Sequence, residues 1–340
     1  MIRTDPLSET LRLIHFVGAT VVQGRFTAPW CYQAPNSATA APLLVPGAES
    51  VIILHMITEG ECYVELDGQA PLHLVAGDAL VIPHGDAHRM TSVPGLPTPT
   101  GGPPLAEILS RRPSRFDYGG GGAATRIVCG HLACDTRAAN LLFSGLPRVT
   151  RIDARTSNVG AWLEVSLRHA FRENLPSQPG GSSVLAKLAE IMFVEVLRLY
   201  MNMPSDGRMG WLAGAGDPIV GPSLALMHQT PAHPWTLEEL ARAAGRSRST
   251  FAERFQQLVG SPPIQYLTQW RMLLAANLLA WTNTPLGRIG KDVGYPTDTT
   301  FSRAFRREFG VPPAAWRRRH AARTVAQRRL AELGTSLPSA

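Results

Sequence analysis

The 340-residue sequence predicts a multidomain protein of the α and β class, with a β-barrel-like domain and helical pair followed by an all-α domain. Three observations carry this prediction. Short strand-like runs separated by turn residues fill about residues 10–134. Two amphipathic helical patterns follow at residues 159–174 and 183–202. An internal repeat then occupies residues 235–319, and a repeat of this period indicates a duplicated supersecondary unit.

The repeat is the most specific feature of the chain. Its early anchors recur 49 residues apart and its later ones 50 apart, because one residue is inserted near Pro296. The matched pairs are Leu237/Leu286, Leu240/Ile289, Gly245/Gly294, Phe251/Phe301, Gly260/Gly310 and Tyr266/Trp316.

Each copy reads as two helices joined by a glycine turn. A glycine at that turn supplies positive φ, and Ser247 or Thr297 can cap the second helix. Phenylalanines four residues apart would pack inward, which leaves a polar face suited to base edges and phosphates. An ordinary helical hairpin with a solvated face is the alternative. The candidate DNA-binding residues are Arg248, Ser249, Thr250, Glu253 and Arg254 in the first copy, and Asp298, Thr299, Thr300, Ser302, Arg303 and Arg306 in the second.

The residues 289–295 and 301–313 resemble the DNA-binding domain of the AraC/XylS family of transcription regulators. The resemblance covers about residues 222–320. It implies two helix-turn-helix units joined by one long helix, here residues 264–281, with two recognition helices facing successive major-groove turns. The chain departs from the family pattern at Arg246 and at Gly290, where alanine is usual. We expect Gly290 to weaken its helix by about 1 kcal/mol relative to alanine.

The charge of the chain is concentrated in the repeat half. Residues 222–340 hold 16 lysines and arginines against 7 acidic residues, a net charge of +9. Residues 1–221 hold 17 against 19, a net charge of −2. This one-sided excess indicates a phosphate-binding surface in the C-terminal half.

The cysteines and the N-terminus favour a cytoplasmic protein. The four cysteines, Cys31, Cys62, Cys129 and Cys134, form no C-x-x-C pair and do not resemble a disulfide framework. The first 20 residues lack the pattern of a signal peptide, and no apolar run is long enough to cross a membrane. We therefore expect no membrane partner.

Part of the β-rich region resembles a cupin barrel. Gly77, Pro83, Gly85 and His88 have the spacing of the second cupin motif, while His55, Glu61 and Gly68 fit the first only in part. Ile57 and Ser92 stand where the motifs have histidine and asparagine. His73 or His84 could replace a missing ligand, but we predict no metal and no cofactor. The predicted effector-binding residues are His55, Glu61 and His88.

Residues 10–200 as a whole resemble the cupin-type sensor of some AraC-family regulators, which implies a small-molecule effector. Residues 93–124 are rich in proline and glycine and predict an irregular excursion, or alternatively a lid. Cys129, His131, Cys134 and Asp135 could form half a zinc site, although we favour buried side chains of a β core. The two helices at 159–174 and 183–202 favour a dimer interface over simple packing on the barrel.

These patterns together predict a DNA-binding transcription regulator that is not an enzyme. The predicted parts are a cupin-like sensing and dimerisation domain at 1–203, a linker at 204–221, the DNA-binding domain at 222–322 and a basic tail at 323–340. The predicted partners are double-stranded promoter DNA, a small-molecule effector, a second copy of the chain and, as a further candidate, RNA polymerase. The alternative is a cupin-type metal enzyme fused to a DNA-binding domain.

Overall fold

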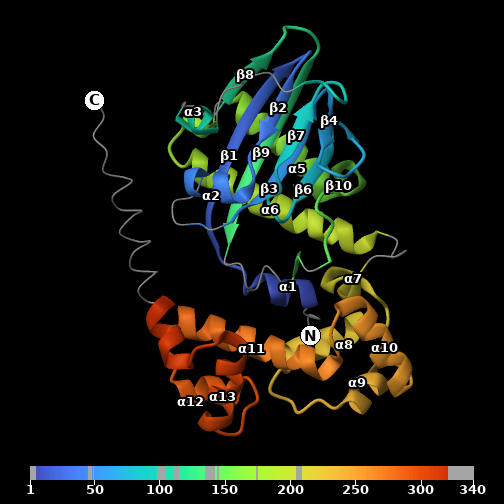
Figure 1. The fold of residues 1–340 in the computed structure, drawn as a ribbon, viewed down its shortest axis with the longest axis vertical. Helices are drawn as coiled ribbons and strands as arrows, with labels where there is room; N and C mark the ends of the chain where they lie inside the picture. The colour runs from blue at the N-terminus through green and yellow to red at the C-terminus, as the bar shows by residue number, and fades with distance from the viewer. Residues whose placement is uncertain are drawn as a thin grey trace. The chain divides into compact units, whose positions relative to one another are not determined.

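The computed structural model describes residues 5–44, 48, 50–97, 105–110, 115–134, 142–143, 145–173, 175–203 and 209–320. The chain divides into two compact units, residues 15–204 and residues 1–14 together with 205–340 (Figure 1). We call residues 15–204 the N-terminal unit and the other the C-terminal unit. The first helix, α1 (Pro6–Leu11), belongs to the C-terminal unit and not to the predicted 1–203 domain. The predicted tail at 323–340 lies outside the described residues.

The N-terminal unit contains two sheets and several helices. Its strands are β1 (Phe16–Thr27), β2 (Cys31–Ala34), β3 (Ile52–Glu59), β4 (Glu61–Glu65), β5 (Leu72–Val75), β6 (Asp78–Ile82), β7 (His88–Thr91), β8 (Arg115–Gly119), β9 (Ala124–Cys134) and β10 (Thr150–Asp153). Its α-helices are α2 (Ser37–Leu44), α3 (Leu105–Ser110), α5 (Asn158–Arg172) and α6 (Gly181–Asn202). Short 3-10 turns at Ala154–Thr156 and Leu175–Ser177 flank α5.

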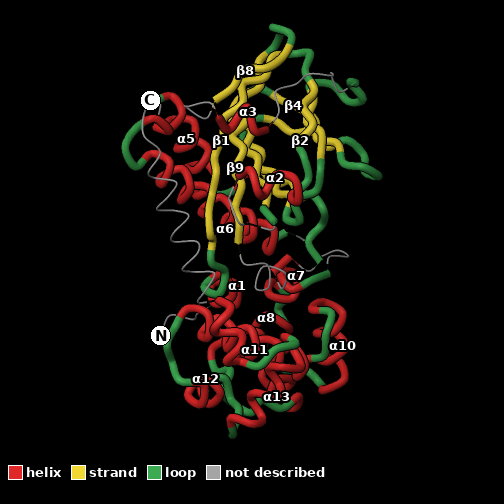
Figure 2. Tube along the Cα trace, turned by 60° about the vertical axis from the view of Figure 1, so that its left-hand side comes forward, coloured by secondary structure: helices red, strands yellow, loops and turns green. Residues whose placement is uncertain are grey.

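The strands form a six-stranded sheet in the order β10-β6-β3-β9-β1-β8 and a four-stranded sheet in the order β2-β7-β4-β5. The β1–β8 pair is parallel, and the other pairings between the described strands are antiparallel. The predicted sheet-rich domain is thus confirmed as two facing sheets, and no closed barrel is formed by the described strands. Helices α5 and α6 lie on one side of the six-stranded sheet and the four-stranded sheet lies on the other (Figure 2).

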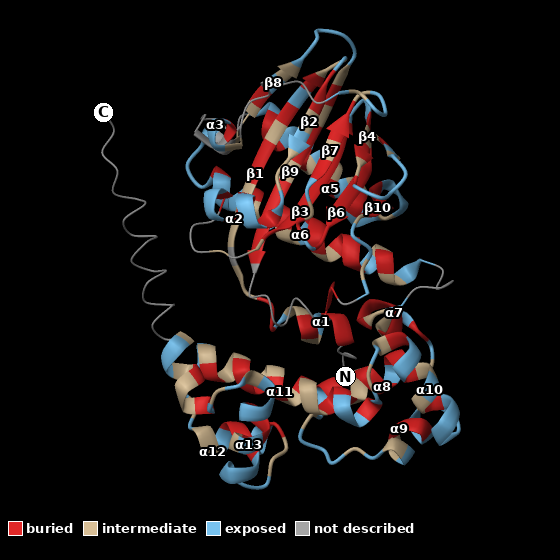
Figure 3. Cartoon of the chain, viewed as in Figure 1, coloured by how far each residue is buried: buried red, intermediate tan, exposed pale blue. Residues whose placement is uncertain are grey.

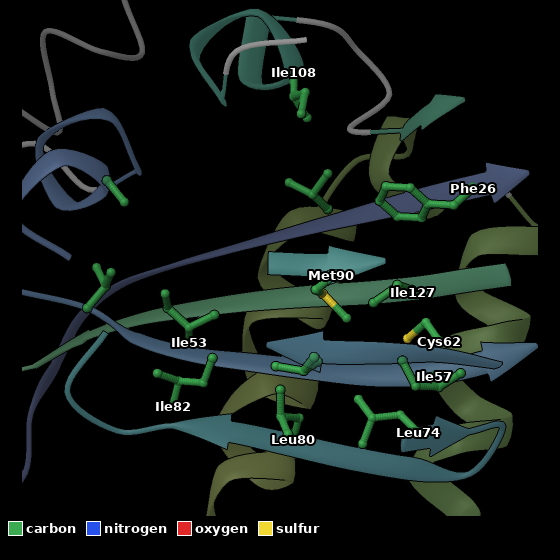
Figure 4. Close-up of a cluster of buried hydrophobic side chains, with 14 of the residues drawn as sticks. Phe26, Ile53, Ile57, Cys62, Leu74, Leu80, Ile82, Met90, Ile108 and Ile127 are labelled. Atoms are coloured by element: carbon green, nitrogen blue, oxygen red, sulfur yellow. The ribbon is translucent and has the colours of Figure 1, made fainter. Parts of the chain in front are cut away.

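The space between the sheets is the core of the N-terminal unit. Because side chains alternate between faces along a strand, Phe26, Ile53 and Ile127 of the large sheet and Cys62 of the small sheet all point into it (Figure 4). These side chains are buried to 2% exposure or less. Complete burial of a large apolar side chain contributes about 1.5–3 kcal/mol, so this layer holds the two sheets together.

Three segments differ from their predicted structure. The proline- and glycine-rich stretch at 93–124 contains helix α3 and strand β8, because Ile108 and Phe116 anchor them in the core. The predicted linker contains helix α7 (Trp211–Gly216), whose Trp211 is fully buried. Residues 11–13, at the start of the range predicted to be rich in strands, form the end of α1 and the turn after it.

The C-terminal unit is helical, as predicted. After α1 and α7 come α8 (Val220–Gln229), α9 (Leu237–Ala243), α10 (Arg248–Val259), α11 (Pro263–Trp281), α12 (Leu286–Asp292) and α13 (Asp298–Phe309). The pairs α9–α10 and α12–α13 are the two copies of the repeat, and α11 is the predicted connecting helix. Residues 313–320 are also helical.

An aromatic stack holds α11 against α8. The ring of His228 lies 3.6 Å from that of Trp270 and nearly parallel to it. The hydroxyl of Tyr266 is 2.6 Å from both Nε1 of Trp211 and Nε2 of His228. The indole N–H donates to the hydroxyl oxygen, so the hydroxyl can donate to the imidazole. Burial lowers the pKa of His228 to about 3, and the neutral ring suits this acceptor role.

The glycines of the repeat are required for two different reasons, backbone conformation and close packing. Gly245 and Gly294 both have positive φ, at 64° and 88°. A Cβ on Gly245 would meet nothing within 4 Å, whereas one on Gly294 would lie 2.9 Å from Cα of Ala232. Gly290, where we expected only a loss of helix propensity, lets α12 approach α13, since a Cβ there would lie 3.2 Å from the Phe301 ring.

The two turn glycines make a matched pair of variants. We expect Gly245→Ala to lower the free energy of unfolding by roughly 1–2 kcal/mol, the usual cost of a side chain in the left-handed region. Gly294→Ala should cost more, because it adds the backbone clash with Ala232. Denaturant unfolding monitored by tryptophan fluorescence measures both, and equal losses would contradict this account.

Candidate DNA-binding surface and effector pocket

The helices α10 and α13 begin in the same way and bury the same kind of face. The hydroxyl of Ser247 accepts from the backbone N–H of Thr250, and that of Thr297 from Thr300, at 3.3 and 3.2 Å. Side-chain caps of this kind fix where a helix begins. Phe251 and the other three repeat phenylalanines are at most 1% exposed, so each helix has only one face available to a ligand.

The opposite face of each helix is exposed (Figure 3). Most of the predicted DNA-binding residues lie there, although Thr250 and Thr300 also take part in the capping hydrogen bonds. Ser302 is half-buried. The exposed residues are Arg248, Ser249, Thr250, Glu253, Asp298, Thr299, Thr300, Arg303 and Arg306.

Arg254 has a different position from the one we expected. Its Nη2 lies 2.8 Å from Oδ2 of Asp217, a carboxylate that also accepts from the backbone N–H groups of Ile219 and Val220. Burial alone would raise the pKa of Asp217, but these hydrogen bonds and the Arg254 ion pair outweigh it and lower the pKa. Arg254 thus ties α10 to the start of α8, and the sequence offered no sign of this because Asp217 is 37 residues away.

Gln256 is an exposed residue that the sequence analysis missed. It lies on α10 one turn after Glu253 and corresponds in the repeat to Arg306. Glutamine can pair with adenine in the major groove. The fifty-residue offset of the repeat, applied to Arg306, could have found it.

A second candidate site lies between the two sheets of the N-terminal unit. It is a cavity of about 50 Å³ with a predominantly apolar wall. Leu105 and Ile108 of α3 and Ala40 of α2 line part of it, while His55, Cys129 and His131 bring the polar groups. Cys129 and His131 share one face of β9, as alternation along a strand predicts.

The polar groups form a chain of hydrogen bonds. The Nδ1 atom of His88 lies 3.0 Å from the backbone carbonyl of Asp86, which can only accept. In the neutral ring this leaves Nε2 of His88 as an acceptor for Nε2–H of His55, 3.0 Å away. The Nδ1 atom of His55 then accepts from the thiol of Cys129 at 3.1 Å.

Burial keeps this chain uncharged. It lowers the pKa of His55 well below the usual value, with help from His88 and His131, and lowers the pKa of His88 to about 4. Burial likewise raises the pKa of the Cys129 thiol to about 12. Burial and the nearby His88 lower the pKa of His131 to about 4, while a hydrogen bond with the backbone of Thr20 acts in the opposite direction. The Nδ1 atom of His131 has no hydrogen-bond partner among the described residues. That nitrogen is available to a ligand.

Glu61 does not join His55 and His88, contrary to our expectation. It is exposed on β4, where its Oε2 lies 3.0 Å from Nε2 of His73 on the adjacent strand β5. Glu61 starts a strand of the other sheet with its side chain outward, a register that the motif spacing did not reveal. His84 is also exposed.

The described residues do not fit the metal set of a cupin. Within them, no group of three or more histidine, cysteine or acidic side chains could hold a metal ion. The two facing nitrogens of His55 and His88 already serve each other. Of the cysteine cluster considered above, Asp135 and the side chain of Cys134 lie outside the described residues.

The duplicated helix-turn-helix and the sheet-rich N-terminal unit define a class, the DNA-binding regulators with a cupin domain. Comparison with known families agrees. The cupin family matches residues 5–202, and a helix-turn-helix domain family matches residues 240–319. No described helix is long and apolar enough to span a membrane.

The chain is similar to named regulators over most of its length. An AraC-like transcription regulator of Streptomyces antibioticus is 32% identical, covering 92% of this chain and 98% of that protein. The regulator AlkR of Acinetobacter baylyi is 29% identical, covering 79% and 89%. The DNA-binding domain of AdpA, solved with a target DNA, is 33% identical over 32% of this chain and 96% of that one, at a TM-score of 0.30. The chain belongs to the AraC family of transcription regulators, and its C-terminal domain binds double-stranded DNA.

Proposed function

We propose that this regulator reads its operator with α10 and α13 and is controlled by a small molecule bound between the sheets of its N-terminal unit. The exposed polar face that α10 and α13 both present is the main support for their role in reading DNA. The exposed arginines Arg248, Arg303 and Arg306 have no ion pair among the described residues, so their guanidinium groups are free for guanine or phosphate. Arg254 is left out of this proposal because it is held by Asp217.

The proposal predicts two kinds of arginine variant. Arg303→Ala should weaken binding to the specific operator by roughly 1–3 kcal/mol and leave random DNA little affected, because a base contact carries sequence information. Arg318→Ala, in the exposed part of the last described helix, should weaken both DNAs alike and lower the salt dependence. Binding titrations at several salt concentrations measure both effects. Unchanged specific affinity in Arg303→Ala would reject this base-reading role.

The effector site is proposed from the cavity and its unpartnered nitrogen. His131 can accept from or donate to one polar group, while the apolar wall encloses the remainder of a compact ligand. His55 and Cys129 act as a fixed polar floor, because they are hydrogen-bonded to each other and His55 is also hydrogen-bonded to His88. A cavity of 50 Å³ is smaller than a usual ligand pocket. A larger effector would therefore have to displace α3, whose Leu105 and Ile108 cover it.

A thermal-shift screen with small alcohols, amides and aromatic compounds tests this site. Binding to the folded state raises the melting temperature, and the rise grows with the logarithm of the ligand concentration above Kd. A compound that stabilises the wild type should lose that effect in His131→Leu. It should keep the effect in His73→Leu, because His73 lies outside the cavity and forms an exposed pair with Glu61. A shift that survives in His131→Leu would exclude His131 as the contact.

We further propose that the protein is a homodimer joined through α5. This helix buries Leu163 and Leu167 against its own unit but leaves Trp162 and Val165 exposed at 52% and 63%. Adjacent exposed apolar residues on one helix are typical of a contact surface. Two such surfaces would pair by a twofold axis, which would also place two DNA-binding units on one operator.

If the protein dimerises through α5, a charged side chain placed on that helix should weaken the dimer strongly. Val165→Glu should weaken self-association at least tenfold, because it would bury a carboxylate in the contact. Ser183→Glu, at the exposed first turn of α6, is the matched control and should leave it unchanged. Sedimentation velocity over a range of protein concentrations measures both, and a wild type that stays monomeric would end this proposal.

We also propose that this effector-controlled dimer acts in the cytoplasm. If it activates transcription, RNA polymerase is a further partner that it would contact. The names of the relatives support regulation as the role of the chain, and the lack of fit to a metal set within the described residues disfavours the fused-enzyme alternative.

A further inference from the structure

A second hollow of the N-terminal unit lies on the outer face of the six-stranded sheet, opposite the cavity. It has a volume of about 650 Å³, within the range of ordinary ligand sites. Strands β1, β3, β8 and β9 form its floor and α5 forms one wall. We call it the arginine groove after its five arginines, which are Arg25, Arg115, Arg126, Arg168 and Arg172.

The strand register explains why the arginines gather. Arg25 of β1 lies directly opposite Arg126 of β9, and Gln23 of β1 lies beside Arg115 of β8. Like charges placed opposite each other on a sheet repel, so this arrangement costs stability unless something offsets it. Glu59 pairs with Arg126, and Asp117 pairs with Arg25 at 3.4 Å. These two are the acidic residues among those lining the groove.

Two arginines remain without an acidic partner. Arg168 pairs with Glu164 along α5, but Arg115 and Arg172 form no ion pair with any described residue. Their guanidinium groups therefore leave the groove with an excess of positive charge. Arg172 is exposed at the end of α5, where water can solvate it.

Arg115, unlike Arg172, has buried guanidinium nitrogens that lack a partner in the described part of the chain. Its Nε and Nη2 atoms are buried and have no hydrogen-bond partner among the described residues. Its guanidinium carbon lies 5.6 Å from the centre of the Phe171 ring of α5, within the range of a cation–π contact. Burial and the nearby charge of Arg126 both lower the pKa of Arg115, so the protein stabilises this cation poorly by itself.

We propose that the arginine groove binds a small oxyanion with two or more negative charges, held in the fork of Arg115 and by Arg172. Two parallel N–H donors match the two oxygens of a carboxylate or phosphate group. Such an anion would satisfy the buried donors and offset the repulsion between the arginines. This site is separate from the apolar cavity on the inner face, because Arg126 and Ile127 are consecutive on β9 and point to opposite sides of the sheet.

Titration of the full chain with inorganic pyrophosphate and with citrate tests the groove, with sodium chloride holding the ionic strength constant. We expect saturable binding of at least one of them by calorimetry. Arg115→Met, which keeps the aliphatic stem over Phe171, should weaken it at least tenfold. Arg155→Met is the matched control, because Arg155 is an arginine of the same unit paired with Asp153 outside the groove, and it should leave the affinity unchanged.

A stability measurement separates binding from folding. Without the anion, Arg115→Met should not lower the melting temperature, because the removed charge has no acidic partner among the described residues, and relief of its burial and of its repulsion from Arg126 offsets the lost contact with the Phe171 ring. A lowered melting temperature would mean that Arg115 serves the fold, and would overturn the proposal. So would absent binding of both anions, or equal affinity in wild type and Arg115→Met. Weaker DNA binding of Arg115→Met with unchanged anion binding would point to a phosphate contact with DNA and equally reject it.

Discussion

The alternation of side chains along β3, β9 and β1 is the constraint on which both sites of the N-terminal unit depend. On the inner face these strands carry Ile53, His55 and Cys129, which close the space between the sheets. On the outer face the same strands carry Thr58, Arg126 and Arg25, which form the floor of the arginine groove, and Glu59 joins them after a shift in register between Ile57 and Glu59. A shift of one residue in register would exchange the two faces and put arginines into the core. The buried apolar layer therefore fixes the chemistry of both surfaces at once.

The inner face shows how a few polar groups can be kept in an apolar interior. Each member of the Asp86–His88–His55–Cys129 chain finds a partner, so burial costs little. The same burial holds the imidazoles neutral and the thiol protonated. His131 is the exception, with one nitrogen unpartnered among the described residues. A fully satisfied floor beside one open position is the arrangement expected of a selective polar contact in an otherwise apolar site.

The C-terminal unit depends on a different kind of constraint, the repeated capping and packing of two short helical hairpins. The hydroxyl caps at Ser247 and Thr297 fix where the recognition helices begin, and the buried phenylalanines fix their rotation. Only the remaining face can meet DNA. Within this plan the two copies are not equivalent, because Arg254 of the first holds Asp217 while its counterpart in the second, Ala304, is packed in a core cluster.

Much of this protein was determined by the sequence by itself. The offset of 49–50 residues, the turn glycines and the phenylalanine pairs predicted the duplicated helical domain, because these signals are local and depend on helix and turn geometry alone. The sheet-rich character of the N-terminal half and helices α5 and α6 followed from the same kind of local pattern. His55 and His88 were predicted together from motif spacing, and they do meet, at 3.0 Å.

The tertiary structure alone decided what depends on partners far apart in the chain. Glu61 faces outward and Cys129 faces His55 because of strand register, which a motif spacing does not encode. Arg254 is tied to Asp217 across 37 residues, and α3, β8 and α7 are ordered by burying Ile108, Phe116 and Trp211 in sequences of weak local preference. The arginine groove is the clearest case, since its residues come from four strands and a helix and no local pattern marks them. Long-range packing overrides local propensity in each of these places, because burial of one large side chain outweighs the preferences of several residues.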